Sequence, residues 1–318
     1  TVAKPLEYKI AFYQSDDLKS WKFESEFGKT GAFGGQWECP DLFPLTYEGK
    51  NKWVLLVSIN PGGPNGGSAT QYFIGDFDGK TFTADNLPYP LWIDYGRDNY
   101  AGVTFSNIPQ TDGRRIFIGW MSNWDYANDV PTKGFRSAMT VARELTLKNN
   151  GKHLILANTP TREVTALRGK VKTIANQIIH KEKSLPDVLS SFNGKFEIEM
   201  TIQRQSSKIL GFGLTNADGD YLNFTFDLEQ NMLKVDRRNC GLNDFSRKYV
   251  SEPIAPLSTR DSYKVRLLVD KASSEIFIND GETVMTNIVF PTQNFSSLSF
   301  FTLNQSWEAE DIKIYEIN

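Results

Sequence analysis

The sequence predicts an all-β protein with two domains, on three observations. Aromatic residues make up 13% of the chain, the apolar runs are short, and turn-forming residues separate them. Long stretches with the 3.6-residue period of an amphipathic helix are nearly missing, and residues 170–180 form one weak helical candidate. Short strands at regular spacing between such turns are typical of all-β folds.

The strands expected in the first half are short apolar runs, beginning with residues 8–13. The others lie at residues 53–57, 72–75 and 116–120, with turn signals at residues 60–63, 65–67, 78–80 and 111–113. The glycine-rich stretch 60–67 is interpreted as a hairpin loop. It lacks the Lys-Ser/Thr ending and the following helix that a phosphate-binding loop needs.

The second half alternates between apolar and polar residues, as half-buried antiparallel strands do. Residues 196–202 and 263–267 show this alternation, and residues 275–282 predict a strand that enters a hairpin turn at Asp280-Gly281. Strands of this kind build sandwiches. A chain of 318 residues can hold two domains, and we expect them at residues 1–150 and 165–318.

Charge and cysteine content exclude several classes of protein. The formal net charge is -3 with acids and bases interspersed, which predicts no nucleic-acid partner. No apolar run is long enough to span a membrane. Cys39 and Cys240 lie far apart, so two unrelated buried thiols are expected rather than a disulfide framework. With two histidines and no C-x-x-C pattern, no metal site is predicted.

Residues 37–41, Trp-Glu-Cys-Pro-Asp, are the most informative stretch for chemistry. A carboxylate beside Trp, Cys and Pro is expected to be partly desolvated, and desolvation favours a carboxyl group that holds its proton. Such a group can protonate the leaving oxygen of a glycosidic bond. Glu38 is therefore the candidate general acid. The alternative is a glutamate that points outward from an edge strand.

An ordered series of motifs resembles glycoside hydrolase family 32 along essentially the whole chain. The Glu-Cys-Pro-Asp of residues 38–41 looks like that family's E-C-P-D motif. The further matches are S-x-D-L-x-x-W at residues 15–21, D-Y-G-[KR]-D at 94–98, W-M-S-N-W at 120–124, R-E-L at 143–145 with Ala142 in place of Pro, and sandwich motifs at 235–237 and 269–281. The resemblance is closer to bacterial levanases and exo-inulinases than to yeast or plant invertases.

The resemblance implies a fold and an activity. The fold is part of a five-bladed β-propeller followed by a C-terminal β-sandwich. The activity is cleavage of terminal fructosyl bonds in fructans or sucrose, with retention, through a covalent intermediate on an Asp. Glu38 is the implied acid/base, no cofactor takes part, and the location is extracellular or periplasmic.

Family resemblance also implies substrate-binding residues. They are Asp94, Arg97, Trp120, Asn123, Trp124 and Cys39. Simpler roles remain open for some of them. Asp94 and Arg97 are alternatively a loop ion pair, and Trp120 and Trp124 are alternatively core residues. In the functional interpretation, aromatic faces pack on the C–H faces of a sugar, and the Asn123 amide reaches hydroxyls.

The sequence departs from the family at its first blades. It contains neither the N-D-P-N motif of the nucleophile nor the R-D-P motif of the transition-state Asp. At about 40–50 residues per blade, the first 150 residues hold roughly three blades. We therefore expect the N-terminal blades to be missing, the isolated chain to be inactive, and a strand edge to be exposed.

Three functional hypotheses stay open at this point. The chain is an incomplete β-fructosidase, a module that binds fructan without cutting it, or one half of an enzyme completed by a second polypeptide. A related propeller family that cuts arabinans is the runner-up, but it lacks the paired E-C-P and W-M-S-N-W motifs. The sequence does not decide between levan, inulin and sucrose.

Overall fold

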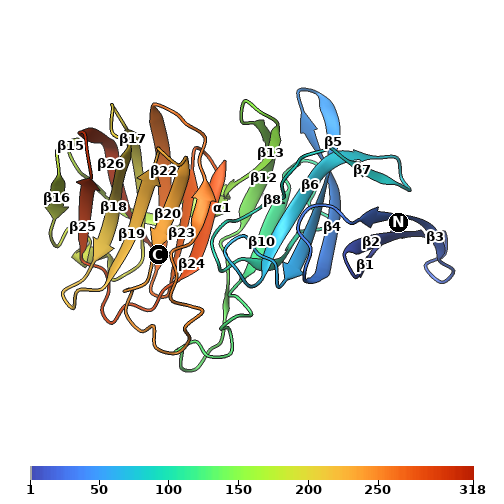
Figure 1. Ribbon diagram of the computed structural model, residues 1–318, viewed down its shortest axis with the longest axis horizontal. Helices are drawn as coiled ribbons and strands as arrows, with labels where there is room; N and C mark the ends of the chain where they lie inside the picture. The colour runs from blue at the N-terminus through green and yellow to red at the C-terminus, as the bar shows by residue number, and fades with distance from the viewer. Residues whose placement is uncertain (1) are drawn as a thin grey trace. The chain divides into compact units, whose positions relative to one another are not determined.

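The computed structural model describes residues 2–318 and divides them into two compact units (Figure 1). Unit 1 consists of the described residues up to Asp125 together with Ala138–Thr161, and unit 2 consists of Tyr126–Ser137 and Arg162–Asn318. The expected bounds of 1–150 and 165–318 leave out the excursion of residues 126–137 into unit 2. No helix among residues 2–318 is long and apolar enough to cross a membrane.

Unit 1 contains three antiparallel sheets. The first has the order β1 (Val2–Leu6), β2 (Lys9–Gln14) and β3 (Lys22–Gly28). The second has the order β4 (Gln36–Tyr47), β5 (Lys50–Asn60), β6 (Ala69–Phe77) and β7 (Phe82–Ala84), and β8 (Leu91–Trp92) also pairs with β6. The third has the order β11 (Ala138–Met139), β10 (Ile116–Met121), β12 (Arg143–Asn149) and β13 (Leu154–Pro160), and β9 (Tyr100–Thr104) pairs with β10.

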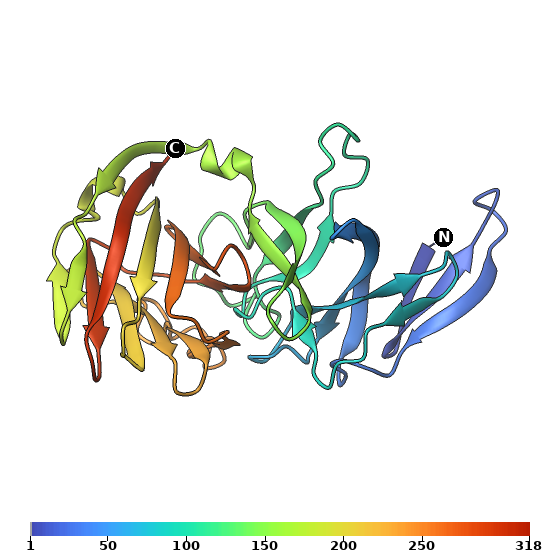
Figure 2. The same cartoon turned by 90° about the horizontal axis from the view of Figure 1, so that it is seen from above.

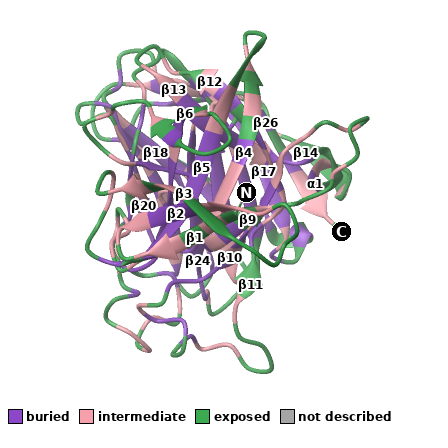
Figure 3. Cartoon of the chain, turned by 90° about the vertical axis from the view of Figure 1, so that its right-hand side faces the viewer, coloured by how far each residue is buried: buried purple, intermediate pink, exposed green. Residues whose placement is uncertain are grey.

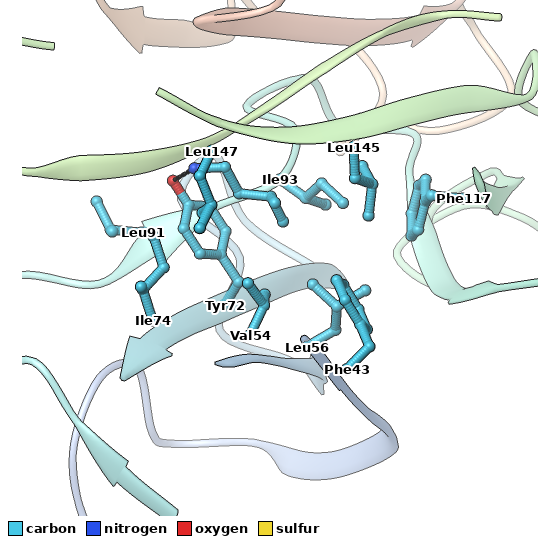
Figure 4. Close-up of a cluster of buried hydrophobic side chains, with 11 residues drawn as sticks. Phe43, Val54, Leu56, Tyr72, Ile74, Leu91, Ile93, Phe117, Leu145 and Leu147 are labelled. Carbon is cyan, nitrogen blue, oxygen red and sulfur yellow. Dashed lines mark hydrogen bonds between the residues drawn. The ribbon is translucent and has the colours of Figure 1, made fainter. Parts of the chain in front are cut away.

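Two hydrophobic clusters hold these sheets together. One joins β2 to the second sheet through residues such as Phe12, Trp37 and Leu55. The other joins the second and third sheets, and Figure 4 shows Tyr72 of β6 in it beside Leu147 of β12. Both faces of the second sheet are therefore covered, which is why β5 and β6 are mostly buried (Figure 3). The strand at residues 53–57 has the continuous apolar run that two covered faces require.

The first sheet lies at one end of unit 1 in both ribbon views (Figures 1 and 2). Within residues 2–318, β1 pairs with β2 alone, so it is an edge strand. Its side chains are exposed or half-buried throughout. An edge of this kind offers unpaired backbone groups to another strand.

Unit 2 is a β-sandwich of two antiparallel sheets. One has the order β14 (Arg168–Thr173), β26 (Trp307–Ile317), β17 (Phe196–Gln203), β22 (Ser262–Asp270), β23 (Ser273–Ile278) and β24 (Thr283–Ile288), with β15 (Gln177–Ile179) also on β26. The other has the order β16 (Glu182–Leu185), β25 (Ser297–Thr302), β18 (Ile209–Thr215), β19 (Tyr221–Asp227), β20 (Met232–Asp236) and β21 (Ile254–Pro256). Its helices are α1 (Arg162–Thr165) and one 3₁₀ turn (Ser190–Phe192).

The alternation in residues 196–202 produces the expected inward face, with one addition. Phe196, Ile198 and Ile202 are fully buried, but Glu197 on the polar face is fully buried as well. Its carboxylate accepts hydrogen bonds from the guanidinium groups of Arg168 and Arg266. A buried carboxylate needs such partners, and these arginines lie on strands far away in sequence.

Residues 126–137 are anchored in unit 2 through Tyr126. The guanidinium of the buried Arg237 donates to the Tyr126 hydroxyl at 2.8 Å and lies 4.3 Å from the centre of the Tyr249 ring. Tyr126 also packs edge-on against Tyr249 at 5.5 Å between ring centres. This contact with Arg237, 111 residues away, is what draws the segment into unit 2.

The structure corrects two sequence-based expectations and confirms two others. Residues 170–180 are not helical: β14 and β15 cover most of them, since their β-branched side chains favour strands and β26 offers a pairing edge. Both cysteines are free, as expected. Cys240 is buried, but Cys39 is only half-buried, so the expectation of a buried thiol is wrong for Cys39. The glycine-rich stretch 60–67 does join two paired strands, β5 and β6, and the β23–β24 hairpin turns through Asp280-Gly281.

Candidate active site

Glu38 lies on β4 at a bulge. The register with β5 pairs Glu38 with Ser58 but Asp41 with Leu56, so the strand is irregular at Cys39-Pro40. Cys39 has a φ of 47°, which lies in the left-handed region. A bulge re-aims the side chains beside it, and here Trp37 is fully buried while Glu38 is half-buried. β4 ends its sheet, so the edge-strand part of the alternative interpretation is correct.

The Glu38 carboxylate is held by Tyr100 on β9. The Tyr100 hydroxyl donates a hydrogen bond to Glu38 Oε2, and the backbone N–H of Thr104 donates to Asp41 Oδ2 at 2.6 Å. The two ends of β9 are therefore hydrogen-bonded to β4 on either side of the bulge. Burial raises the pKa of Tyr100, and the bond to Glu38 raises it further. The phenol thus remains a donor at neutral pH.

The Cys39 thiol is not activated by this environment. Burial raises its pKa, and the neighbouring Glu38 charge adds to the effect. A thiolate is the reactive form of cysteine, so Cys39 is a neutral, polarisable neighbour of the carboxylate. Its predicted contact with substrate stays a prediction.

Aromatic rings lead from the Glu38–Tyr100 pair to the surface. Tyr100 and Trp120 lie edge to face at 6.3 Å between ring centres. Trp120 and Trp124 lie 4.9 Å apart with 40° between their planes. Trp120 is half-buried, and Trp124 is 49% exposed. An exposed indole suits the apolar face of a sugar, so the core interpretation does not fit Trp124.

Asp94 is buried and paired in the described chain, and its predicted contact with substrate stays a prediction. It is 2% exposed. Its Oδ2 accepts from a terminal nitrogen of Arg143 at 2.8 Å, and its Oδ1 accepts from the backbone N–H of Gly96 at 2.8 Å. The pair joins the D-Y-G-R-D stretch to the R-E-L stretch. A buried pair of this type is strongly destabilising to break.

Arg97 forms an ion pair with Asp125. The Nη2–Oδ2 distance is 2.6 Å, and Arg97 is 6% exposed. The alternative interpretation was an ion pair between Asp94 and Arg97. Both residues do form ion pairs, but Asp94 pairs with Arg143 and Arg97 pairs with Asp125. The predicted sugar contact of Arg97 stays a prediction.

The Asn123 amide holds three loops together. Its Nδ2 donates to the carbonyl of Arg97 at 2.7 Å and of Gly66 at 3.3 Å, and its Oδ1 accepts from the N–H of Asp125 at 2.9 Å. Asn123 is fully buried. Its amide is therefore occupied by backbone, and contact with sugar hydroxyls stays a prediction.

Two important residues were missed by the sequence analysis. Tyr100 is 62 residues away from Glu38, and Asp125 directly follows the W-M-S-N-W motif. No sequence signal could have identified Tyr100, because β9 reads Tyr-Ala-Gly-Val-Thr without alternation between apolar and polar residues. Among residues 2–318, no group of three or more His, Cys, Asp or Glu side chains could hold a metal ion.

Comparison with known proteins gives consistent matches over both units. The model of the glycosyl hydrolases family 32 N-terminal domain matches residues 1–158, and that of the family 32 C-terminal domain matches residues 163–316. The chain is 39% identical to a levanase of Bacillus subtilis (strain 168), over 97% of this chain and 47% of the relative. It is 33% identical to an extracellular exo-inulinase of Aspergillus awamori, over 98% of this chain and 60% of the relative.

Solved structures agree with these matches. The exo-inulinase from Aspergillus awamori superposes with a TM-score of 0.87 at 30% identity, covering 98% of this chain and 63% of that one. A fructofuranosidase from Schwanniomyces occidentalis complexed with fructose gives 0.80 at 28% identity, covering 99% and 67%. The chain spans about half the length of the curated relatives it matches. With both of its units matched, the chain belongs to glycosyl hydrolase family 32.

Proposed function

We propose that this chain is the acid/base-bearing part of a retaining β-fructosidase that releases fructose from fructans or sucrose. The observation that carries the proposal is the Glu38–Tyr100 hydrogen bond at the inner end of the Trp120–Trp124 aromatic pair. The names of the relatives, levanase and exo-inulinase, support the substrate class. Relatives named as extracellular support a location outside the cell.

Glu38 acts as the general acid in this proposal. Tyr100 fixes one carboxylate oxygen, so the other is free to face the glycosidic oxygen, while Trp124 binds the sugar face. Retention needs a second carboxylate about 5–5.5 Å from the first. Asp98 is fully buried and is unsuited to that role. The nucleophile therefore comes from residues outside these 318, in the same polypeptide or in a second one.

The three sheets of unit 1 form blades of a five-bladed propeller in this proposal. Their face-to-face packing through two hydrophobic clusters supports this architecture. In a propeller the inner strands bring side chains from successive blades to one axis. That would explain how Tyr100 of β9 contacts both Glu38 of β4 and Trp120 of β10.

Fructose release by two proteins tests the proposal. One is the 318-residue chain, and the other is an extended enzyme that also carries the N-D-P-N and R-D-P motifs. Each is incubated with levan, inulin and sucrose, and free fructose is measured by chromatography. We expect release from the extended enzyme only. Release by the 318-residue chain would contradict the assignment of the nucleophile to residues outside it.

Glu38→Gln in the extended enzyme tests the acid/base assignment. General acid catalysis contributes about 10²–10⁴-fold, so kcat on sucrose should fall by that factor. With an aryl fructoside, whose leaving group needs no proton, the loss of the first step should be much smaller. The matched control is Glu48→Gln, an exposed glutamate on the β4–β5 turn. Equal losses on both substrates would remove Glu38 from the acid role.

Binding without cleavage is the second candidate function, favoured by the exposed indole of Trp124 within this chain. In that case the chain alone binds fructan, Trp124→Ala abolishes binding, and the extended enzyme adds no fructose release. The same pair of proteins thus distinguishes the two functions.

A further inference from the structure

Unit 1 contains a cavity that lies away from Glu38 and the aromatic pair. Its volume is about 290 Å³, and neither Glu38 nor Trp124 lines it. The lining comes from the end of β3, from β6 and β7, from residues 85–91 and from the β12–β13 hairpin. Ligand pockets in proteins start at about 300 Å³. The cavity therefore suits a ligand of one ring rather than a chain of several.

Aromatic side chains form much of its wall. Phe27 meets Phe73 edge to face at 4.9 Å and Phe82 at 5.0 Å between ring centres. Tyr89 lies at the rim and is 47% exposed. The wall thus offers ring faces for C–H groups, and Tyr89 offers a face accessible from solvent.

His153 contributes the polar part of the lining. Its Nδ1 lies 3.4 Å from the Tyr89 hydroxyl. Its Nε2 is buried, with no hydrogen-bond partner among residues 2–318. Burial lowers the pKa of His153, and Lys152 lowers it further, so the imidazole is neutral at pH 7. The Nδ1 contact with Tyr89 is longer than an ordinary hydrogen bond, so a ligand hydroxyl can replace it.

These features define the chemistry of a ligand that fits the cavity. A neutral imidazole has one donor and one acceptor nitrogen, and a hydroxyl group can serve either. The acidic Asp85 at the cavity lies 3.6 Å from Lys52, so the rim favours neither an anion nor a cation. Asn86 adds an amide that can bond hydroxyls. A neutral, hydroxyl-rich ring satisfies the aromatic wall and the polar groups together.

We propose that this cavity is a second sugar site, which binds one fructosyl unit against Tyr89 and His153 without cleaving it. The choice of fructosyl over another sugar rests on the proposed function. Such a site would hold a fructan chain on the enzyme while the end of a chain is cut elsewhere. The long Tyr89–His153 contact is the one that a sugar hydroxyl replaces.

Imidazole NMR on the 318-residue chain tests the proposal, because the chain has only two histidines. The chain is labelled with ¹⁵N and carries Glu38→Gln, and its ring signals are followed as D-fructose or a fructan trisaccharide is added. His180 is exposed in unit 2 and serves as the internal control, with His180→Gln for assignment. We expect the His153 signals to shift in a saturable way and the His180 signals to stay.

Tyr89→Ala should weaken this binding at least about tenfold, because it removes the exposed ring face. Phe33→Ala is the matched control, since Phe33 is 61% exposed and does not line the cavity, and it should leave the titration unchanged. Glycerol, an acyclic polyol, should not saturate the site. The proposal is overturned if His153 does not respond to 100-fold excess sugar, if glycerol acts like fructose, or if Tyr89→Ala and Phe33→Ala behave alike.

The outcome is independent of catalysis. A saturable His153 response in a protein whose extended form releases no fructose would support the second site and overturn the proposed function. Fructose release by the extended enzyme without a His153 response would support the proposed function and overturn the second site.

Discussion

At the scale of single residues, the candidate site depends on pairs that join distant motifs. Glu38 is bonded to Tyr100, Asp94 to Arg143 and Arg97 to Asp125. In each pair, one residue belongs to a family motif, and its partner lies in a different part of the chain. Each pair can be tested by removing one polar group.

Tyr100→Phe removes one hydroxyl from the Glu38 environment and little volume. A hydrogen bond to a charged group contributes about 1.5–3 kcal/mol, so we expect kcat of the extended enzyme to fall at least about tenfold with KM nearly unchanged. Thermal stability is measured alongside the kinetics. An unchanged kcat with lower thermal stability would make Tyr100 a purely structural residue.

Arg97→Ala and Asp125→Asn separate a sugar contact from a structural ion pair. Both variants break the 2.6 Å pair, so both should lose stability in urea unfolding. We expect KM of the extended enzyme to rise in Arg97→Ala more than in Asp125→Asn, because only the first removes the guanidinium from substrate. Equal KM values in the two variants would assign Arg97 to structure alone.

At the scale of elements, the β5–β6 hairpin supports the site through its glycines. Gly67 has a φ of 68°, and a Cβ there would lie 2.0 Å from Asn123 Oδ1. The loop therefore needs glycine for its backbone conformation and for the close approach of the Asn123 amide. The same amide fixes the backbone of Arg97 and Asp125, so the loop positions the ion pair.

Gly67→Ala should destabilise unit 1 more than Gly79→Ala does. Gly79 also has a positive φ, of 97°, but no atom lies within 4 Å of a Cβ there. The control therefore measures the conformational effect, about 1 kcal/mol, and Gly67→Ala adds the clash with Asn123. Urea unfolding followed by tryptophan fluorescence measures the difference. Equal effects would mean that the Asn123 amide moves away without loss.

At the scale of the whole molecule, the edge strand β14 of unit 2 carries more positive charge than the edge strand β1 of unit 1. In unit 2 the edge strand β14 carries Lys170 and Lys172, and charged edges oppose strand addition. In unit 1 the edge strand β1 carries a single lysine, Lys4, followed by Pro5, and it begins with Val2, which is 43% exposed. The exposed aromatic residues Trp21 and Phe23 add apolar surface near the same sheet.

The 318-residue chain should self-associate at micromolar concentrations through β1. Val2→Lys should reduce the association measured by sedimentation velocity, because a lysine on the edge opposes pairing. Val171→Lys, the same change on the lysine-rich edge β14, should leave it unchanged. A chain that is monomeric at every concentration, or equal effects of both substitutions, would contradict this prediction.

The sequence by itself determined the all-β class, the sandwich strands and the family. These follow from local signals: alternation in residues 196–202, turn residues such as Asp280-Gly281, and motifs of consecutive residues such as 38–41. Such signals are visible because the residues that carry them are close neighbours in the chain.

Only the tertiary structure decided which side chains meet. Tyr100, Arg143, Arg168 and Arg266 lie between 29 and 69 residues from the carboxylates that they bind. No local pattern records such pairings. Residues 170–180 were mistaken for a weak helix for the same reason, since their strand conformation is stabilised by β26 at the far end of the chain. Antiparallel sheets bring distant residues side by side, so burial and ion pairing depend on register across strands rather than on the sequence near each residue.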